Sequence, residues 1–595
     1  MSETSTDAAS ADEPEHPCRV NRRTFLGAGA RAGGALALAT LGLDAMIPAA
    51  SSAAVRRRIY AQHAAAPPNI LVVMVDQLRA PCWFGPGARG SVALPDAIGA
   101  LARGGVSFAR HYTASNDCSP ARAALLTGLH SHQTGCMITG VSSLDPAFPT
   151  WGAMLGGMGY ASYWFGKWHL TRSDRWWDQL DGPPALARYG FEGGTFPSPN
   201  GSPGQGLAVD GAIAAQFEDW YSSSGGEGPW CTTVSFVNPH DIAWWWRATA
   251  ALPAEASAPR SVGGLPANFE TPAQLVARDK PRLQRSLQET SASSFGAVPF
   301  EGPGVASAWR PFLDLYVDLQ RQADGHVARV LAALASRPQV AANTVVLFTS
   351  DHGEYGASHG LRGKGASVYE EAIRVPLILA DNTGRLGLAP GVRRQLSSSV
   401  DVAPLLLTLA SGSSGWRADP QYSPLAARAD LLAIARDPSA PGRPWALHAT
   451  DEVVTEFALA PYAADAPLHV SGIVTPTHKY ATYSHWRAGT LEPVAATQER
   501  ELYDFTIFSG RLEVDNRAGH HRQEGRLAAL LEHATATELH APLPASLTST
   551  QRGAIAGYHA LAQQEHALAT SVRRDPATLA RVPAPPPDAA HARAA

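Results

Sequence analysis

The stretch Asn-Ile-Leu-Val-Val-Met-Val at residues 69–75, followed directly by Asp76 and Gln77, decides the fold class of this chain. An apolar, β-branched run that does not alternate with polar residues is typical of a strand buried on both faces, as in the centre of a parallel sheet. Comparable runs recur at 161–165, 233–237 and 344–349. Each run leads into polar residues, so the sequence predicts several central strands with polar side chains at their ends.

Helical patterns lie between these runs, for example at 95–103, 121–127 and 311–334. Alternation of strands and helices predicts an α/β fold in which helices sandwich a mostly parallel central sheet. Ligands of such sheets bind at the carboxyl ends of the strands. We therefore expect the polar residues that follow the strands to converge on one edge of the sheet.

The fold predicted from these patterns has two parts. A catalytic domain is expected at 66–440, and a smaller antiparallel α+β subdomain at 441–580. Short strands in the second part are predicted at 445–448, 453–457, 469–475 and 479–484. The segment 248–309 is either a solvated insertion or a lid, with one helix at 271–288. The proline-containing tail at 581–595 is expected to be disordered.

Composition excludes some classes of function. Of the 595 residues, 17% are charged, the formal net charge is -4, and no basic cluster lies on a periodic element, so no nucleic-acid partner is expected. The five cysteines are too few and too scattered for a disulfide framework, and none forms a CxxC pair; they are Cys18, Cys82, Cys118, Cys136 and Cys231. One cysteine with a special role is consistent with this count.

Residues 1–55 have the pattern of a targeting segment. Arg22 and Arg23 precede Phe-Leu-Gly, an apolar stretch follows at 28–50, and small residues stand at 51–54. The paired arginines before a mildly apolar run resemble a twin-arginine signal, which predicts a periplasmic or secreted protein that uses the twin-arginine export machinery. Asp44 and Pro48 interrupt the run, so no transmembrane span is expected.

The segment Cys-Ser-Pro-Ala-Arg at 118–122 carries the strongest chemical signal. Pro120 suits the first turn of a helix and Gly128 can end that helix, so Cys118 is expected at its N-terminus. Free N–H groups there favour a negatively charged group. Taken alone, Cys118 could also be a buried capping residue or a thiolate nucleophile of the Cys-His kind.

This segment resembles the C-x-P-x-R signature of the sulfatases, formylglycine-dependent members of the alkaline phosphatase superfamily. The resemblance implies that a maturation enzyme oxidises Cys118 to formylglycine, the nucleophile. It also implies one divalent cation, bound by Asp76, Gln77, Cys118, Asp351 and His352. Hard oxygen ligands with one imidazole suit Ca²⁺, with Mn²⁺ or Mg²⁺ as alternatives. Many family members have aspartate in place of Gln77 and asparagine in place of His352.

Three further segments are similar to family motifs, and they contain Lys167 with His169, His240, and Lys364. The resemblance implies that Arg122 and Lys167 hold the formylglycine. It implies that His169 accepts the proton of the second hydroxyl, and that His240 and Lys364 bind the sulfate and protonate the leaving alcohol. Weaker similarity at 397–404 and 501–504 extends the match over residues 69–516.

The function predicted from these motifs is that of an arylsulfatase-like sulfuric ester hydrolase acting on a small-molecule sulfate monoester. The alternative is a phosphonate monoester or phosphate diester hydrolase that uses the same nucleophile. A plain cysteine hydrolase would need no metal, and a non-catalytic binding module would be expected to lose site residues. Two tryptophan groups, 176–177 and 244–246, either line the substrate pocket or pack internally.

Overall fold

The computed structural model describes residues 67–81, 94–140, 142–171, 182–225, 228–245, 264–453 and 462–574. The predicted export segment at 1–55, the tail at 581–595 and the tryptophans at 176–177 lie outside the described residues. Among the described helices, none is long and apolar enough to cross a membrane.

The main sheet has eight strands in the order β4-β3-β5-β1-β6-β7-β2-β8. Their bounds are β1 (Asn69–Val75), β2 (Val106–Tyr112), β3 (Ala161–Gly166), β4 (Gly193–Gly194), β5 (Trp230–Phe236), β6 (Thr344–Thr349), β7 (Leu377–Asp381) and β8 (Gly391–Ser398). All neighbouring strands pair in parallel except β7, which runs antiparallel to both β6 and β2. The predicted mostly parallel sheet is therefore confirmed.

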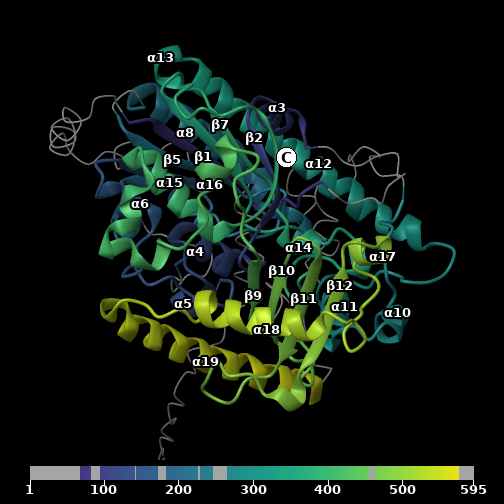
Figure 1. The fold of residues 1–595 in the computed structure, drawn as a ribbon. Helices are drawn as coiled ribbons and strands as arrows, with labels where there is room; N and C mark the ends of the chain where they lie inside the picture. The colour runs from purple at the N-terminus through teal and green to yellow at the C-terminus, as the bar shows by residue number, and fades with distance from the viewer. Residues whose placement is uncertain are drawn as a thin grey trace, which may run out of the picture.

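Helices cover both faces of this sheet (Figure 1). One face carries α3 (Asp96–Gly104), α8 (Gln205–Ser223) and α12 (Val305–Ala335); the other carries α4 (Cys118–Thr127), α6 (Trp151–Gly156), α15 (Val402–Ser411) and α16 (Leu431–Arg436). Leu71, Val73 and Val75 of β1 pack toward the first group, whereas Ile70, Val72 and Met74 pack toward the second. Each buried aliphatic side chain stabilises the fold by roughly 1.5–3 kcal/mol, which explains the uninterrupted apolar run.

A separate four-stranded antiparallel sheet lies in the C-terminal part, in the order β12-β11-β10-β9. Its strands are β9 (Ala446–Thr450), β10 (His469–Val474), β11 (His478–Ser484) and β12 (Glu499–Asp504). Helix α18 (Glu524–Ala534) packs Leu527 and Leu531 against this sheet, and α19 (Ala545–Arg574) lies beside it (Figure 1). Of the predicted strand at 453–457, only Val453 is described, and it is not in a strand.

The predicted single helix at 271–288 is wrong, because the chain forms two helices there. They are α10 (Pro272–Ala277) and α11 (Arg282–Phe295). Asp279 has a left-handed φ of 48°, and Pro281 cannot continue a helix because it lacks an N–H. Leu283 and Leu287 of α11 are buried in an apolar cluster, so the described part of this segment is packed.

The remaining helices are short. They are α5 (Ser131–Thr134), α7 (Pro183–Ala187), α13 (Pro338–Ala341), α14 (Glu370–Ile373) and α17 (Phe508–Arg511). A 3₁₀ turn, η2 (His240–Trp244), follows β5. The carboxyl ends of β1, β3, β5 and β6 thus open onto α4 and η2, where the predicted site residues lie.

Candidate active site

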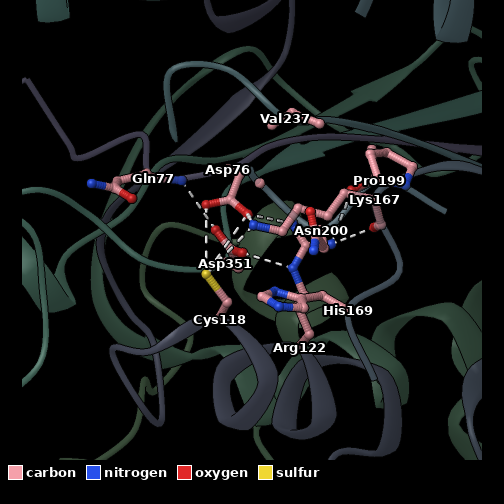
Figure 2. A network of polar contacts seen from close by, with 12 residues as sticks. Asp76, Gln77, Cys118, Arg122, Lys167, His169, Pro199, Asn200, Val237 and Asp351 are labelled. Atoms are coloured by element: carbon pink, nitrogen blue, oxygen red, sulfur yellow. Dashed lines mark hydrogen bonds and ion pairs between the residues drawn. The ribbon is translucent and has the colours of Figure 1, made fainter. Parts of the chain in front are cut away.

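Four strand ends and one helix N-terminus supply the site. Asp76 follows β1, Lys167 follows β3, His240 opens the turn after β5, and Asp351 lies two residues beyond the end of β6. Their partner is α4, whose first residue is Cys118 (Figure 2). The expected convergence at one sheet edge is therefore observed, as parallel topology requires.

Cys118 lies at the centre of this convergence and is fully buried. Its Sγ is 3.1 Å from His352 Nε2 and 3.1 Å from Lys364 Nζ. Lys167 Nζ lies at 3.7 Å, and both carboxylate oxygens of Asp76 lie at 3.9 Å. One side-chain atom therefore meets two ammonium groups, an imidazole and a carboxylate, at a helix N-terminus that itself favours negative charge.

Arg122 and Lys167 hold the two aspartates in place. Arg122 donates from Nη2 to Asp76 at 2.9 Å and from Nε to Asp351 at 2.8 Å, and Lys167 Nζ lies 2.7 Å from Asp76 Oδ2. Burial alone would raise the pKa of Asp76, but Lys167, His240 and Arg122 together hold it well below its ordinary value. The Asp76 carboxylate is thus kept ionised inside the protein.

The ligand atoms of Asp76, Cys118, Asp351 and His352 all lie within 4.8 Å of one another. His352 Nδ1 lies 3.0 Å from the Gly353 carbonyl, which can only accept, so Nδ1 carries the proton and Nε2 turns its lone pair to the cluster. Burial lowers the pKa of His352, which keeps the ring neutral. Two carboxylates and one oriented imidazole fit a divalent cation.

Gln77 joins the network differently from the other predicted ligands. Its backbone N–H donates to Asp351 Oδ1 at 3.2 Å, and its side-chain oxygen accepts from Lys364 Nζ at 3.0 Å. Its amide nitrogen donates to Glu354 Oε2 at 2.5 Å, and the amide extends away from the Asp76 carboxylate in Figure 2. Sequence reasoning assigned no role to Glu354, although it stands two residues after His352.

Glu354 also accepts from the backbone N–H groups of Gly356 and Gly363, at 3.1 and 2.8 Å. Gly363 precedes Lys364, so one buried carboxylate ties together the segment after β6, the loop that carries Lys364 and the Gln77 amide. Glu354 therefore positions two predicted site residues without lying among the four grouped ligand atoms.

The two remaining predicted residues, His169 and His240, are both buried. The Ser119 hydroxyl donates to the His169 carbonyl at 2.7 Å, which links the Lys167 segment to the start of α4. A Cβ at Gly201 would lie 2.6 Å from His240 Cε1 and 2.9 Å from Lys167 Nζ. Gly201 also has a φ of 94°, so only glycine fits there.

Gly201 was missed by sequence reasoning, since it belongs to no motif. Its carbonyl accepts from Trp244 Nε1 at 2.8 Å. Trp245 packs in an apolar cluster with Trp309 and Phe312. Of the two interpretations of the 244–246 group, internal packing describes Trp244 and Trp245, both of which are buried.

Two buried aspartates hold the turn that carries His240. Asp210 accepts from the backbone N–H groups of Val237 and Asn238, at 2.7 and 2.8 Å. Asp241 accepts from Gly206 and Leu207 in the first turn of α8, at 3.3 and 3.0 Å. Helix α8 and the turn after β5 thus bind each other reciprocally, which limits the movement of His240.

Comparison with known proteins agrees with this site. The Sulfatase family model matches residues 68–413. The chain is 26% identical over 370 residues to the uncharacterized sulfatase YidJ of Escherichia coli (strain K12), covering 58% of this chain and 68% of that protein. It is 30% identical over 397 residues to the steryl-sulfatase of Mus musculus, covering 58% of this chain and 62% of that protein.

Solved structures share the fold. A 2-O GAG sulfatase superimposes with a TM-score of 0.58 at 22% identity, covering 80% of this chain and 93% of the other. The phosphonate monoester hydrolase of Silicibacter pomeroyi gives a TM-score of 0.59 at 21% identity, covering 81% and 97%. At these identities the likeness concerns the fold alone. The family model spans more than half of the sequence and includes every residue of the site, and the chain belongs to the sulfatase family.

Proposed function

We propose that this protein hydrolyses a small-molecule sulfate monoester, with residue 118 as the nucleophile after oxidation of the cysteine to formylglycine. The observation that carries the proposal is the convergence on Cys118 Sγ of four residues from other parts of the chain, Asp76, Lys167, His352 and Lys364. Arg122, one turn further along the same helix, holds Asp76 and Asp351. An internal structural cysteine needs none of these charged neighbours, since burial alone would stabilise the neutral thiol.

The charge balance favours an anionic substrate. Arg122, Lys167 and Lys364 face Asp76 and Asp351 around Cys118, while the third buried carboxylate, Glu354, lies behind Gln77, so positive charge is in excess next to residue 118. Desolvated, fixed cations stabilise developing negative charge more than water does. A sulfate ester brings one negative charge and gains another when it leaves as sulfate, so this excess is suited to the reaction.

A modified side chain at residue 118 and a bound cation would complete the proposed chemistry. The hydrated aldehyde of formylglycine would supply one hydroxyl for attack on sulfur and a second whose deprotonation would expel sulfate and restore the aldehyde. A divalent cation, for which we propose Ca²⁺, would be held by Asp76, Asp351, His352 and residue 118, with Gln77 beside them, and would supply charge neutralisation at the ester oxygens. A formylglycine-generating enzyme would be the maturation partner.

The protein's own residues would bind and move protons. Lys364 and Lys167, whose Nζ atoms lie 3.1 and 3.7 Å from Sγ, would hold the oxygens of residue 118 and of the sulfate. His169 would take the proton of the second hydroxyl. His240, held by the Asp241 turn and given room by the missing side chain at Gly201, would donate a proton to the leaving alcohol.

The second candidate is a phosphonate monoester or phosphate diester hydrolase. It is favoured by the neutral Gln77, which puts an amide where many family members have a carboxylate. A fold shared with phosphonate monoester hydrolases is compatible with it. A kinetic panel of an aryl sulfate, an aryl phosphonate monoester and a phosphate diester decides between the two. The proposal requires the highest kcat/KM for the sulfate, and a higher value for either phosphoryl ester would overturn it.

For the location of the protein we propose export through the twin-arginine pathway, supported by Arg22 and Arg23 in the sequence. Replacing both arginines by lysine should leave folded, active protein in the cytoplasm, whereas the wild type is found in the periplasm or the medium. Fractionation followed by a sulfatase assay measures this. Undiminished export of the double variant would contradict the proposal.

A further inference from the structure

A second group of metal-ligating side chains lies in the C-terminal sheet, apart from the site around Cys118. His478 is the first residue of β11 and Asp504 the last residue of β12, and the two are direct cross-strand partners. His521 comes from the segment just before α18. One ligand atom from each residue lies within 4.8 Å of the others, so three distant parts of the sequence bring two imidazoles and a carboxylate together.

His478 points an unsatisfied nitrogen into this group. The residue is only 4% exposed, and its Nδ1 lies 2.8 Å from the Thr477 hydroxyl. Its Nε2 is buried and has no hydrogen-bond partner; the carboxylate of Asp504 is 3.8 Å away. A buried polar atom without a partner costs free energy, so the position of Nε2 suggests that a ligand satisfies it.

The carboxylate of Asp504 is held by two hydrogen bonds from Thr506. Asp504 Oδ1 accepts from the Thr506 backbone N–H at 2.9 Å and from the Thr506 hydroxyl at 2.6 Å. Asp504 Oδ2 lies 3.6 Å from His521 Nε2. Separations of 3.6 and 3.8 Å exceed a hydrogen bond, whereas two ligands of a tetrahedral Zn²⁺ stand about 3.3 Å apart. Each histidine thus faces its own oxygen of Asp504, His478 at 3.8 Å from Oδ1 and His521 at 3.6 Å from Oδ2, beyond hydrogen-bond distance.

We propose that His478, Asp504 and His521 bind Zn²⁺, with water in the fourth position. Two imidazoles and one carboxylate suit Zn²⁺ better than Ca²⁺ or Mg²⁺, which prefer oxygen ligands. The Thr477 hydroxyl would accept from His478 Nδ1–H, the outer contact that fixes the ring of a metal-bound histidine. The ion would be an addition to the catalytic cation and would take no part in ester hydrolysis.

One neighbouring contact, from Gln523 to His521, constrains the site. The Gln523 backbone N–H donates to His521 Nδ1 over a long 3.3 Å; binding through Nε2 exchanges this bond for a coordinate bond and moves the ring proton to Nδ1.

Binding would join the β11–β12 hairpin to the chain that enters α18. That helix covers the sheet through Leu527 and Leu531. A ligand that binds only the folded state stabilises it by mass action. Zinc is thus expected to raise the thermal stability of the C-terminal part of the molecule, and the activity of the enzyme is not expected to depend on it.

The test compares adjacent histidines in full-length protein. His521→Gln removes a ligand, whereas His520→Gln changes the exposed neighbour and serves as the matched control. Both are placed in an Asp351→Asn background, which weakens the catalytic cation site, stripped with chelator and titrated with Zn²⁺ by calorimetry. The proposal requires one equivalent fewer in His521→Gln than in His520→Gln. Equal stoichiometry and equal affinity in the two variants would overturn it.

Thr477→Val provides an independent readout that leaves all three ligands in place. Loss of the outer contact is expected to weaken Zn²⁺ binding about tenfold, and unchanged affinity would count against the assigned geometry. In the otherwise wild-type chain, His521→Gln should retain full sulfatase activity and lose the zinc-dependent rise in Tm. A failure of the sulfatase proposal would appear in the substrate panel, which these zinc measurements do not involve.

Discussion

Two buried ionic networks in this protein use similar residues and differ in what they surround. Around Cys118, the cations Arg122 and Lys167 bind Asp76 and Asp351. Near the junction of the two sheets, His359 Nδ1 lies 2.5 Å from Glu270, and its Nε2 lies 3.7 Å from Glu371. Both networks contain ionised groups inside the fold, and burial alone does not distinguish them.

The two networks differ in the atoms that their charged groups contact. In the second network the partners close on one another: His359 stacks on Tyr369 with centroids 3.6 Å apart, and Lys280 donates to Tyr369 and Tyr503. In the first, the charged groups converge on one reactive atom, Cys118 Sγ, and leave the His352 Nε2 lone pair facing it. Convergence of charged groups on one reactive atom, more than perturbed charge, therefore marks a functional site.

The largest expected effect is that of Cys118→Ala. Activity should fall at least about 10⁴-fold, as when a catalytic nucleophile is removed, while circular dichroism and Tm stay near the wild type. Mass spectrometry of the peptide containing residue 118 in active wild-type protein should find the aldehyde or its hydrate. An intact thiol in fully active enzyme would refute the nucleophile assignment.

Removal of the cation is expected to have the next largest effect. Asp351→Asn, or exhaustive chelation, should lower kcat/KM by about 10³-fold because a divalent cation supplies several kcal/mol of charge stabilisation. Addition of Ca²⁺, Mn²⁺ or Mg²⁺ to chelated wild type should restore the rate and identify the ion. Activity that survives exhaustive chelation would contradict the proposal that the site around Cys118 uses a divalent cation.

In the second network, His359→Ala should reduce stability and spare chemistry. Loss of one partner leaves Glu270 and Glu371 buried with less compensation, which costs about 3 kcal/mol. Denaturant unfolding measures this loss, and kcat of the folded fraction should stay within about twofold of wild type. A fall in kcat without a change in stability would instead give the network around His359 a role in catalysis.

The contribution of His359 to stability is expected to depend on pH. Burial alone would lower the pKa of His359, but its hydrogen bond to Glu270 and the charges of Glu270 and Glu371 raise it above the ordinary value. The folded state therefore gains stability below the unfolded pKa of about 6.5, and this gain is lost as pH rises through the folded value. The stability difference between wild type and His359→Ala should accordingly shrink with rising pH, as urea midpoints at several pH values would reveal.

The smallest expected effect is that of Glu354→Gln at the edge of the first network. One of three hydrogen bonds to the side chain is lost, so the Gln77 amide and the Lys364 loop are held less firmly. A fall in kcat/KM of about tenfold is expected, typical of an outer contact, with weaker binding of the catalytic cation. Unchanged kinetics and cation affinity would make Glu354 a structural residue only.

The central strands and the grouping of the site residues were predictable, because local sequence patterns are enough to predict both. The runs at 69–75 and 344–349 become β1 and β6 with the same bounds, since a continuous apolar run is stable only between two covered faces. Cys118 stands at the start of α4 as Pro120 and Gly128 predicted. The site residues gather because parallel strands end at one edge, which follows from the order of the elements alone.

Only the tertiary structure decided the rest. Strand β2 carries Arg110 and His111 and has no apolar run, yet it pairs with β8 and β7, so its strand form comes from partners far along the chain. The contact of Gly201 with His240, the bonds from Glu354 to the Lys364 loop, and the meeting of His478 with His521 likewise join distant segments. Periodicity and motifs report a residue's neighbours in sequence, whereas these contacts depend on how separate elements pack.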